Sequence, residues 1–488
     1  MPGYYVENFG CRATQADGAA LERQFEELGL ARAGTPAQAS VVVLNTCTVT
    51  SAADQDARAA IRRVQRQNPG ASIVVTGCYA QRAPDEIAAL PGVSYVIGNS
   101  HKHQLARIVL RAPEAVQAQT PQAHIQEAHV HESQGFVPAH ALTWRSGQGR
   151  ADDQIFVSDI FAHTELLAAP VFEAGDSHES ARTRPNLKVQ DGCDNRCSFC
   201  VIPSVRGQSR SLAMERVVRE VNGLVEAGYR EVVISGINLG RWGKDLAVSR
   251  QHSALSETQP QEESDLRLAA MIRAILAETS LEKLRISSVE PMDWTDELIE
   301  LVAGSPRVAR HAHVPLQSGS DAVLRRMHRK YRLWHYREKI EKIHTAMPEA
   351  AIGADVMVGF PGESDFEFEA TRRMIEELPF TYLHVFTYSA RPGTPAAAMP
   401  HQVPVQVARE RNRVLRELAA EKKLAFMRGF VGKVIEAITL RAGGAESTEA
   451  LTNNYLKLQL RGRHEANRWV RARVEDVVDG ELVGALNG

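Results

Sequence analysis

Apolar runs rich in β-branched residues alternate with segments of helical pattern over roughly the first hundred residues. The runs are GYYVENFG, SVVVLNT and SIVVTG, and helix-like segments such as ADGAALERQFEELGL and ADQDARAAIRRVQRQ lie between them. Strands that alternate with helices in this way form parallel sheets with helices on both faces. The pattern therefore predicts an N-terminal parallel α/β domain.

The same alternation returns between residue 185 and about residue 400. Helical segments such as MERVVREVNGLVEAG separate the predicted strands, which read LKVQDG, EVVISGINLG, KLRISSV, HAHVPLQS, AIGADVMVGF and YLHVFTYS. Six βα units at this spacing predict a partial (β/α)6 barrel, whose functional residues lie on the loops after its strands.

The C-terminal part has a third pattern. Residues 404–427 are typical of one charged helix, and the short alternating runs KVIEAITL, NNYLKLQL, RWVRARVEDVV and ELVGAL follow it. Such runs separated by turn residues predict a small antiparallel β-barrel. From residue 405 onwards there are 15 Lys or Arg against 11 Asp or Glu. Small basic barrels often bind single-stranded or looped nucleic acid, with an ordinary solvated surface as the alternative.

Residues 113–180 differ in composition from the rest of the chain. They contain no Lys, two Arg and ten Asp or Glu, for a net charge of −8, and they hold six of the 17 His residues. We interpret the first half, rich in Ala, Gln and His, as a linker or insertion, with a His metal site as the alternative. The more apolar second half is expected to pack on a neighbouring domain.

Composition and cysteine usage narrow the class of protein. The 488-residue chain shows no signal-peptide pattern and no apolar run near the ~18 residues of a membrane span. We therefore expect a cytoplasmic protein that does not span a membrane. It has six Cys, and cytosolic thiols are more often metal ligands or catalysts than disulfide partners.

Three of the cysteines, Cys11, Cys47 and Cys78, each follow one of the first three predicted strands. Ligands of open parallel sheets bind beyond the carboxyl ends of the strands, so these thiols are expected to converge at one edge. Three buried structural cysteines are the alternative, because Cys is often fully buried.

The other three, Cys193, Cys197 and Cys200, lie in the sequence DGCDNRCSFCVIP, directly after a predicted strand. Three thiolates complete neither a zinc tetrahedron nor a four-cysteine iron–sulfur shell. They can hold three irons of a 4Fe-4S cube and leave the fourth iron free for a substrate. Zinc binding by the same thiols is the alternative.

This spacing, followed by a partial barrel, resembles the radical S-adenosylmethionine superfamily. The motifs NTCTVT, TGCYAQ, PLQSGSD, VGFPGE and YSARPGTPAA extend the resemblance to the methylthiotransferases, over nearly the whole chain outside 113–150 and 246–265. The resemblance implies an N-terminal methylthiotransferase domain at 1–112, a linker at 113–184, a radical core at 185–424 and a TRAM-like RNA-binding domain at 425–488.

In that family the open iron chelates S-adenosylmethionine, and one electron cleaves it to a 5′-deoxyadenosyl radical. The resemblance further implies a second 4Fe-4S cluster on Cys11, Cys47 and Cys78, a second S-adenosylmethionine as methyl donor, tRNA as substrate and a one-electron reductant such as flavodoxin or ferredoxin. A monomer is expected. After Cys11, Thr14 stands where relatives usually have Asn, a change near this auxiliary cluster.

The motifs look most like the branch that modifies carbon 2 of threonylcarbamoyl-adenosine. The branches acting on isopentenyl-adenosine or on a ribosomal protein are alternatives, and a non-catalytic iron–sulfur RNA-binding protein is a further class. Arg206, Arg210 and Glu290 are candidate partners of a polar substituent, although such residues usually form salt bridges.

Several strand-end residues are weaker candidates. Gly236, Asn238 and Gln317 are predicted to contact S-adenosylmethionine, and Ser318 to contact the cosubstrate or substrate. The segment from Gly359 to Glu363 has the composition of a tight turn. Phe199 is predicted to cover the cluster or stack on adenine, and simple packing is the alternative for each side chain.

Overall fold

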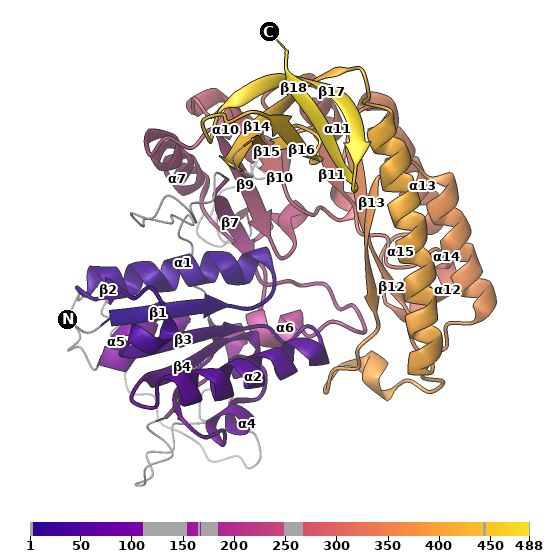
Figure 1. The fold of residues 1–488 in the computed structure, drawn as a ribbon. Helices are drawn as coiled ribbons and strands as arrows, with labels where there is room; N and C mark the ends of the chain where they lie inside the picture. Colours follow the sequence, from indigo (N-terminus) through magenta and orange to yellow (C-terminus); the bar gives the residue numbers. More distant parts are fainter. Residues whose placement is uncertain are drawn as a thin grey trace, which may run out of the picture.

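A computed structural model describes residues 3–110, 154–163, 166, 184–247, 267–442 and 446–487. The predicted insertion at 113–150 and most of the predicted loop at 246–265 lie outside these residues. Within the described ranges, no helix is both long and apolar enough to cross a membrane. Figure 1 shows the N-terminal domain beside a partial barrel, with the C-terminal strands over the barrel's far end.

The N-terminal domain is built on one parallel sheet, as predicted. Its strands run in the order β2 (Ala31–Arg32), β1 (Gly3–Asn8), β3 (Val41–Thr46), β4 (Ser72–Gly77), β5 (Val93–Ile97) and β6 (Ile155–Phe156). Its helices are α1 (Arg12–Glu27), α2 (Ser51–Gln67), α3 (Cys78–Arg82), α4 (Pro84–Ala88) and α5 (Leu105–Leu110), with short 3-10 turns η1 (Pro36–Gln38) and η2 (Lys102–Gln104).

Alternate residues of β3 explain why the sheet is covered on both sides. Val42 and Leu44 pack in one cluster with Ile61 of α2, whereas Val41 and Val43 pack in another with Phe25 of α1. The two-residue period of a strand sends neighbouring side chains to opposite faces. Strand β6 lies within the range assigned to the linker, so part of that segment completes this sheet.

The second domain is the predicted partial barrel. Its parallel strands are β7 (Asn186–Asp191), β9 (Glu231–Gly236) and β10 (Lys283–Ile286), followed by β11 (His311–His313), β12 (Ala351–Val358) and β13 (Tyr382–Thr387). Single bridges such as Ser288–His313 connect the two groups of strands. A short strand, β8 (Arg210–Ser211), pairs antiparallel with β7.

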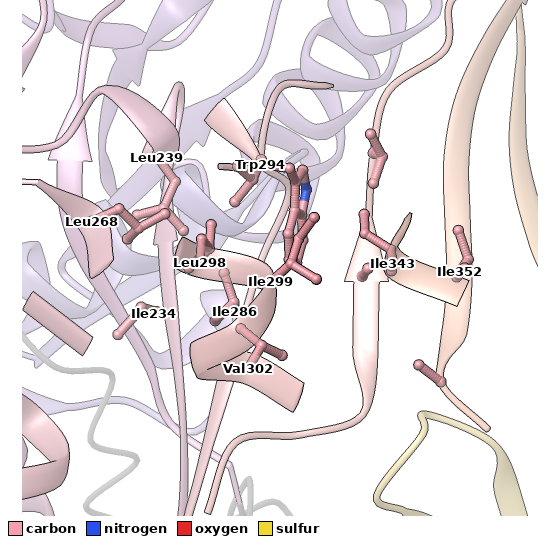
Figure 2. Close-up of a cluster of buried hydrophobic side chains, with 14 of the residues drawn as sticks. Ile234, Leu239, Leu268, Ile286, Trp294, Leu298, Ile299, Val302, Ile343 and Ile352 are labelled. Atoms are coloured by element: carbon pink, nitrogen blue, oxygen red, sulfur yellow. The ribbon is translucent and has the colours of Figure 1, made fainter. Parts of the chain in front are cut away.

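Helices surround this sheet and bury its main core. They are α6 (Ile202–Arg206), α7 (Met214–Glu226), α10 (Leu268–Glu278), α11 (Asp296–Gly304), α12 (Asp321–Arg326), α13 (Leu333–Ala346) and α14 (Asp365–Glu377), with 3-10 turns η4 (Ile160–Ala162), η5 (Leu239–Arg241), η6 (Pro291–Asp293) and η7 (Pro395–Ala398). Figure 2 shows Ile234 and Ile286 of the strands packed with Leu268, Leu298 and Val302 of the helices.

The charged helix forms as α15 (Val405–Arg428) and lies against β13. A closed barrel of five strands follows the helix in sequence. Its strands are neighbours in the order β14 (Val434–Ala442), β15 (Ser447–Thr452), β16 (Lys457–Arg461), β18 (Glu481–Leu486) and β17 (Trp469–Val478). Its pairings are antiparallel except that of β16 with β18, which is parallel. The fold class is therefore confirmed.

The charge surplus of the C-terminal part lies in the helix. Residues 405–428 contain seven Lys or Arg against three Glu, whereas residues 429–488 contain eight cations and eight anions. The barrel itself is therefore neutral, and the basic balance gives no support for RNA binding by its strands.

Candidate functional site

The sheet brings the three N-terminal cysteines to one edge. Cys47 follows β3 directly, Cys78 opens α3 after β4, and Cys11 follows β1 by a short turn at Gly10. Because β1, β3 and β4 are neighbours, their carboxyl ends meet there. At Gly10, whose φ is +101°, a Cβ atom would lie 2.6 Å from the Cβ of Cys47. Only glycine allows the Cys11 turn to approach this closely.

The pKa of Cys47 depends on the other two N-terminal thiols. Burial, followed by the neighbouring Cys78, raises the pKa of Cys47 to about 12, and Cys11 adds to this shift. Such thiols stay protonated at neutral pH unless a cation is bound. The hydroxyl of Thr14, where relatives usually have Asn, lies 3.6 Å from the sulfur of Cys11, so this substitution does adjoin the trio.

The second trio occupies the loop after β7. The Asn195 amide N–H donates to Cys193 Sγ at 3.4 Å, and Asn238 Nδ2 donates to the same sulfur at 3.6 Å. Arg329 Nη1 donates to Cys197 Sγ at 3.4 Å. Burial raises the pKa of Cys200 to about 12. Burial also raises the pKa of Cys193, an effect that the donors from Asn195 and Asn238 oppose. A cationic group held by sulfur would therefore keep this loop's thiols ionised.

The two trios are close neighbours although about 115 residues separate their sequences. Cys78 packs against Val201 and Val205, which directly follow the second trio. Asn99 Nδ2 donates both to Cys78 Sγ at 3.7 Å and to the Val205 carbonyl at 2.7 Å. Helix α3, which Cys78 opens, therefore lies on α6.

A cavity of about 260 Å³ lies where the two domains meet beside the trios. Cys200 and Phe199 line it from the second trio, and Val49 and Thr50, just after Cys47, line it from the N-terminal domain. Phe386 of β13, which is 47% exposed, forms a further part of its wall. The second trio therefore borders the chamber through Cys200, whereas the N-terminal trio reaches it only through the residues that follow Cys47. An aromatic ring is accessible inside the chamber.

Among the weaker candidates, Gln317 lines this chamber and has a φ of +63°, which is uncommon for a residue with a side chain. Asn238 Oδ1 is buried without a partner, although its Nδ2 contacts Cys193. At Gly236 a Cβ would lie 2.8 Å from Gln190 Oε1, so glycine is required there. Contact of all three with S-adenosylmethionine stays a prediction.

Ser318, by contrast, is fully buried and accepts the Ser320 N–H. Gly359 and Gly362 have positive φ, and Glu363 accepts the Gly359 N–H at 2.6 Å, so this segment is a turn. Phe199 packs edge-on against Phe360 at 6.4 Å and also borders the chamber.

A buried ion network connects the two domains beneath the trios. Asp17 of α1 pairs with Lys102, Lys188 and Arg206, and Asp191, two residues before Cys193, pairs with Lys188 and Arg206. Each of these side chains is at most 8% exposed. Three cations against two anions leave one positive charge in excess.

The excess positive charge lies near sulfur. Although burial opposes it, Asp191, Cys78 and Asp17 hold the pKa of Arg206 well above its usual range. An unbalanced buried charge is costly unless an opposite charge is near. Thiolates that hold a cluster would supply that opposite charge.

Replacing Arg206 with Met is expected to destabilise the contact between the domains. The change removes the hydrogen bonds of Arg206 to the buried carboxylates of Asp17 and Asp191, and a hydrogen bond to a charged group contributes about 1.5–3 kcal/mol. Urea unfolding followed by fluorescence measures the effect. Arg413→Met, at an exposed ion pair, is the control and should leave the midpoint unchanged; equal midpoints in both variants would contradict the assignment.

Arg206, Arg210 and Glu290 were candidate partners of a polar substituent, and the structure engages each internally. Arg206 belongs to the buried network, Arg210 donates to the His163 carbonyl at 3.0 Å, and Glu290 pairs with Arg329. Internal ion pairing, the alternative fate, therefore describes Arg206 and Glu290.

Sequence reasoning missed three residues of the site: Asp17, Lys102 and Arg329. Asp17 on α1 and Lys102 on η2 belong to the buried ion network, and Arg329, in the turn after α12, is 132 residues from the Cys197 sulfur to which it donates. One signal was available at Lys188, since a charged residue within the apolar strand LKVQDG has to find a buried partner.

The donor set fits iron–sulfur clusters. All six cysteines are free thiols, each trio has nitrogen donors directed at sulfur, and Asn238 Oδ1 faces no protein partner. Within the described ranges, no three His, Cys, Asp or Glu side chains gather as ligands of a single metal ion. A cube distributes its three thiolates over separate irons, which agrees better with these trios than mononuclear zinc does.

Comparisons with known proteins cover both thiol-bearing domains. Residues 3–98 match the family described as "Uncharacterized protein family UPF0004", and residues 187–375 match the "Radical SAM superfamily".

Three curated relatives match most of the chain. The proteins named "Threonylcarbamoyladenosine tRNA methylthiotransferase MtaB" from Bacillus subtilis and Aquifex aeolicus are 35% and 32% identical, over 93% and 96% of this chain and 90% and 99% of their own. "tRNA-2-methylthio-N(6)-dimethylallyladenosine synthase" from Saccharopolyspora erythraea is 31% identical, over 98% of this chain and 85% of its own.

Proposed function

Because this chain belongs to the radical S-adenosylmethionine methylthiotransferase family, we propose that it inserts a methylthio group at carbon 2 of threonylcarbamoyl-adenosine next to the anticodon of tRNA. As a member of that family it is an enzyme that uses S-adenosylmethionine and a 4Fe-4S cluster. The nucleoside and a second cluster are parts of the proposal.

One observation carries the proposal: the two cysteine trios are neighbours through the contact of Cys78 with Val201, and residues directly after Cys47 and the second trio's Cys200 line one chamber. Carbon 2 of adenine carries a hydrogen that no ordinary base removes, so its replacement needs a carbon radical and a sulfur donor beside the same atom. Holding both reactants in one chamber removes most of the entropic cost of their encounter. A single trio would leave the sulfur source to diffusion.

The two cysteine trios have different roles in this reaction. Cys193, Cys197 and Cys200 would hold the cluster that reductively cleaves S-adenosylmethionine when bound. Cys11, Cys47 and Cys78 would hold the second one, which carries the sulfur. Asn238 and Arg329 keep the second trio oriented through their hydrogen bonds to Cys193 and Cys197.

The chamber suits a nucleobase with a polar substituent. Its volume of about 260 Å³ is slightly below the roughly 300 Å³ at which small-molecule pockets begin, enough for one base. Phe386 offers a ring on which the base can stack. The wall is largely apolar, and Thr50, Gln317 and Ser389 are polar residues among its lining. The Thr50 and Ser389 hydroxyls each accept a backbone N–H, which leaves the Gln317 amide as the main partner for a threonylcarbamoyl group.

The proposal also covers the oligomeric state of the enzyme, its compartment and its partners. The enzyme acts as a monomer in the cytoplasm, where it meets tRNA and a one-electron reductant of the flavodoxin or ferredoxin kind. The names of the Bacillus subtilis and Aquifex aeolicus relatives support tRNA as substrate and the threonylcarbamoyl nucleoside as target.

The test uses two anticodon stem-loop RNAs that differ only in the substituent of the target adenosine. Reconstituted enzyme receives S-adenosylmethionine, dithionite and RNA with either threonylcarbamoyl- or isopentenyl-adenosine, and nucleosides are measured by mass spectrometry. We expect the first RNA to be methylthiolated at least about tenfold faster than the second, because Gln317 in the wall offers a hydrogen-bond partner that only the threonylcarbamoyl group can use. Equal or reversed preference would contradict the assigned branch, and absence of 5′-deoxyadenosine would favour a non-catalytic binder.

A further inference from the structure

The second trio has an outer side as well as the side that borders the chamber. Cys197 lines a small surface hollow together with His328, Arg329 and Lys330, whereas Cys200 lines the chamber. Neither Cys197 nor Lys330 borders the chamber. The loop that carries the second trio therefore borders two openings, the chamber at Cys200 and the surface hollow at Cys197.

Exposed basic side chains lie in and beside the outer hollow, three of them Arg or Lys and one a His. Arg196, Lys244, His328 and Lys330, which we name the Cys197 rim, are all exposed. Within the part of the chain that the structure describes, Arg196, Lys244 and Lys330 have no acidic side-chain partner. The exposed carboxylate in the same loop is Asp194, which accepts the Ser209 N–H at 3.1 Å. The rim is thus positive overall.

Nearby carboxylates offset the rim only in part. Asp293 attracts Lys244 and Lys330, but each nearby carboxylate is paired with a cation of its own. Asp293 pairs with Arg241 at 3.1 Å, and Glu290 pairs with Arg329. Burial, followed by the positive charge of Arg241, lowers the pKa of Lys244, and Lys330 adds to the same effect. Like charges gathered in this way destabilise the fold slightly and attract an anionic partner.

The rim is connected directly to the sulfur ligand. Arg329, between His328 and Lys330 in sequence, donates to Cys197 Sγ at 3.4 Å. His328 Nδ1 lies 3.3 Å from the Arg196 carbonyl, and the Ser198 N–H donates to the Met327 carbonyl at 3.1 Å. A partner seated on the rim therefore contacts the residues that hold the cluster ligand, without entering the chamber.

We propose that the Cys197 rim is the docking surface for a small acidic electron-carrier protein, of the flavodoxin or ferredoxin kind, that reduces the group held by the second trio. The proposal rests on the proposed function, since it supplies the electron that this function needs. The carrier loses one electron, for example from a flavin hydroquinone that becomes a semiquinone, and the iron–sulfur group gains it.

The position of the rim favours an electron carrier over RNA. The target base has to reach the chamber, on the Cys200 side, whereas the rim lies on the Cys197 side. Electron-transfer complexes are small, transient and steered by opposite charges, which an exposed cationic rim over a ligand loop provides. Docking there leaves the chamber free for substrate.

The test reverses two rim charges in the reconstituted enzyme, Lys244→Glu with Lys330→Glu. Affinity for an oxidised acidic flavodoxin is measured by titration calorimetry at low salt. We expect at least tenfold weaker binding in the double variant, and a difference that vanishes near 0.5 M salt because screening shortens the range of surface charges. The control is Arg463→Glu with Arg471→Glu, two exposed cations of the C-terminal barrel, which should bind flavodoxin as the wild type does.

Two further readouts separate the possible outcomes. 5′-Deoxyadenosine formation with dithionite, a small reductant that needs no docking, and affinity for tRNA should both be unchanged in the rim variant. Unchanged flavodoxin affinity would overturn the proposal, and a loss of tRNA affinity alone would make the rim an RNA-binding surface instead. If wild-type enzyme forms no 5′-deoxyadenosine with dithionite, the proposed function fails, while the binding titration still tests the rim.

Discussion

Replacing Cys11, Cys47 and Cys78 together with Ala should abolish methylthiolation while leaving cleavage of S-adenosylmethionine intact. The three thiols meet at one edge of the N-terminal sheet beside the chamber, and the second trio lies on a separate loop with its own hydrogen bonds. Removing the first trio therefore removes the sulfur donor and leaves the radical source.

The measurement compares two products from the same reaction. We expect 5′-deoxyadenosine within about twofold of wild type and methylthio nucleoside reduced by at least 1000-fold, below detection. Far-ultraviolet circular dichroism confirms that the variant is folded. Methylthiolation at a tenth of the wild-type rate or more would show that these thiols are buried structural cysteines, the alternative that the sequence left open.

The second large effect concerns Cys193, Cys197 and Cys200. Their replacement with Ala should abolish both 5′-deoxyadenosine and methylthio nucleoside, because the donors from Asn238 and Arg329 would then face no sulfur and no cluster could bind there. Catalysis of this kind needs every member of the ligand set, so single replacements should be as damaging as the triple one.

The control for this variant is spectroscopic. The auxiliary trio is untouched, so the reduced protein should still give a paramagnetic resonance signal from about four irons. Residual 5′-deoxyadenosine formation with full iron content would mean that the radical chemistry resides on the N-terminal trio, which the assignment excludes.

The sequence predicted the architecture well because its signals are local. Each apolar run of the N-terminal domain and of the partial barrel became a strand, and each cysteine of the first trio lies at a strand end as predicted. Strand β15 was missed because STEALT has few apolar residues, and its β character depends on pairing with β14 and β16. Strand β5, with the sequence VSYVI, was also missed, although it is apolar enough to have been predicted. Strand β6 of two residues has too little pattern to be seen.

The buried network could not be predicted from the sequence, because its partners are distant. Asp17 and Lys188 are 171 residues apart, and only packing of α1 beside β7 brings them together (Figure 1). Arg206 is a sequence candidate because a polar substituent needs polar partners, yet it is 2% exposed and paired with Asp17 and Asp191. Ion pairs between residues so far apart in sequence are determined by the fold and cannot be read from the sequence.

The electrostatic setting of the trios was visible only in part. The unusual Thr14 suggested a change around Cys11, and the structure does place its hydroxyl 3.6 Å from that sulfur. Arg329, which contacts Cys197, lies in a stretch rich in cations, RRMHRKYR, where no single residue stands out in the sequence. Its role becomes apparent only from the distance to sulfur.

Iron and acid-labile sulfide in anaerobically reconstituted wild-type protein test the central claim most directly. Two thiol trios that each hold one cube predict about eight irons and eight sulfides per chain. A value that stays near four after full reconstitution would contradict the account, since only one trio would then hold a cluster.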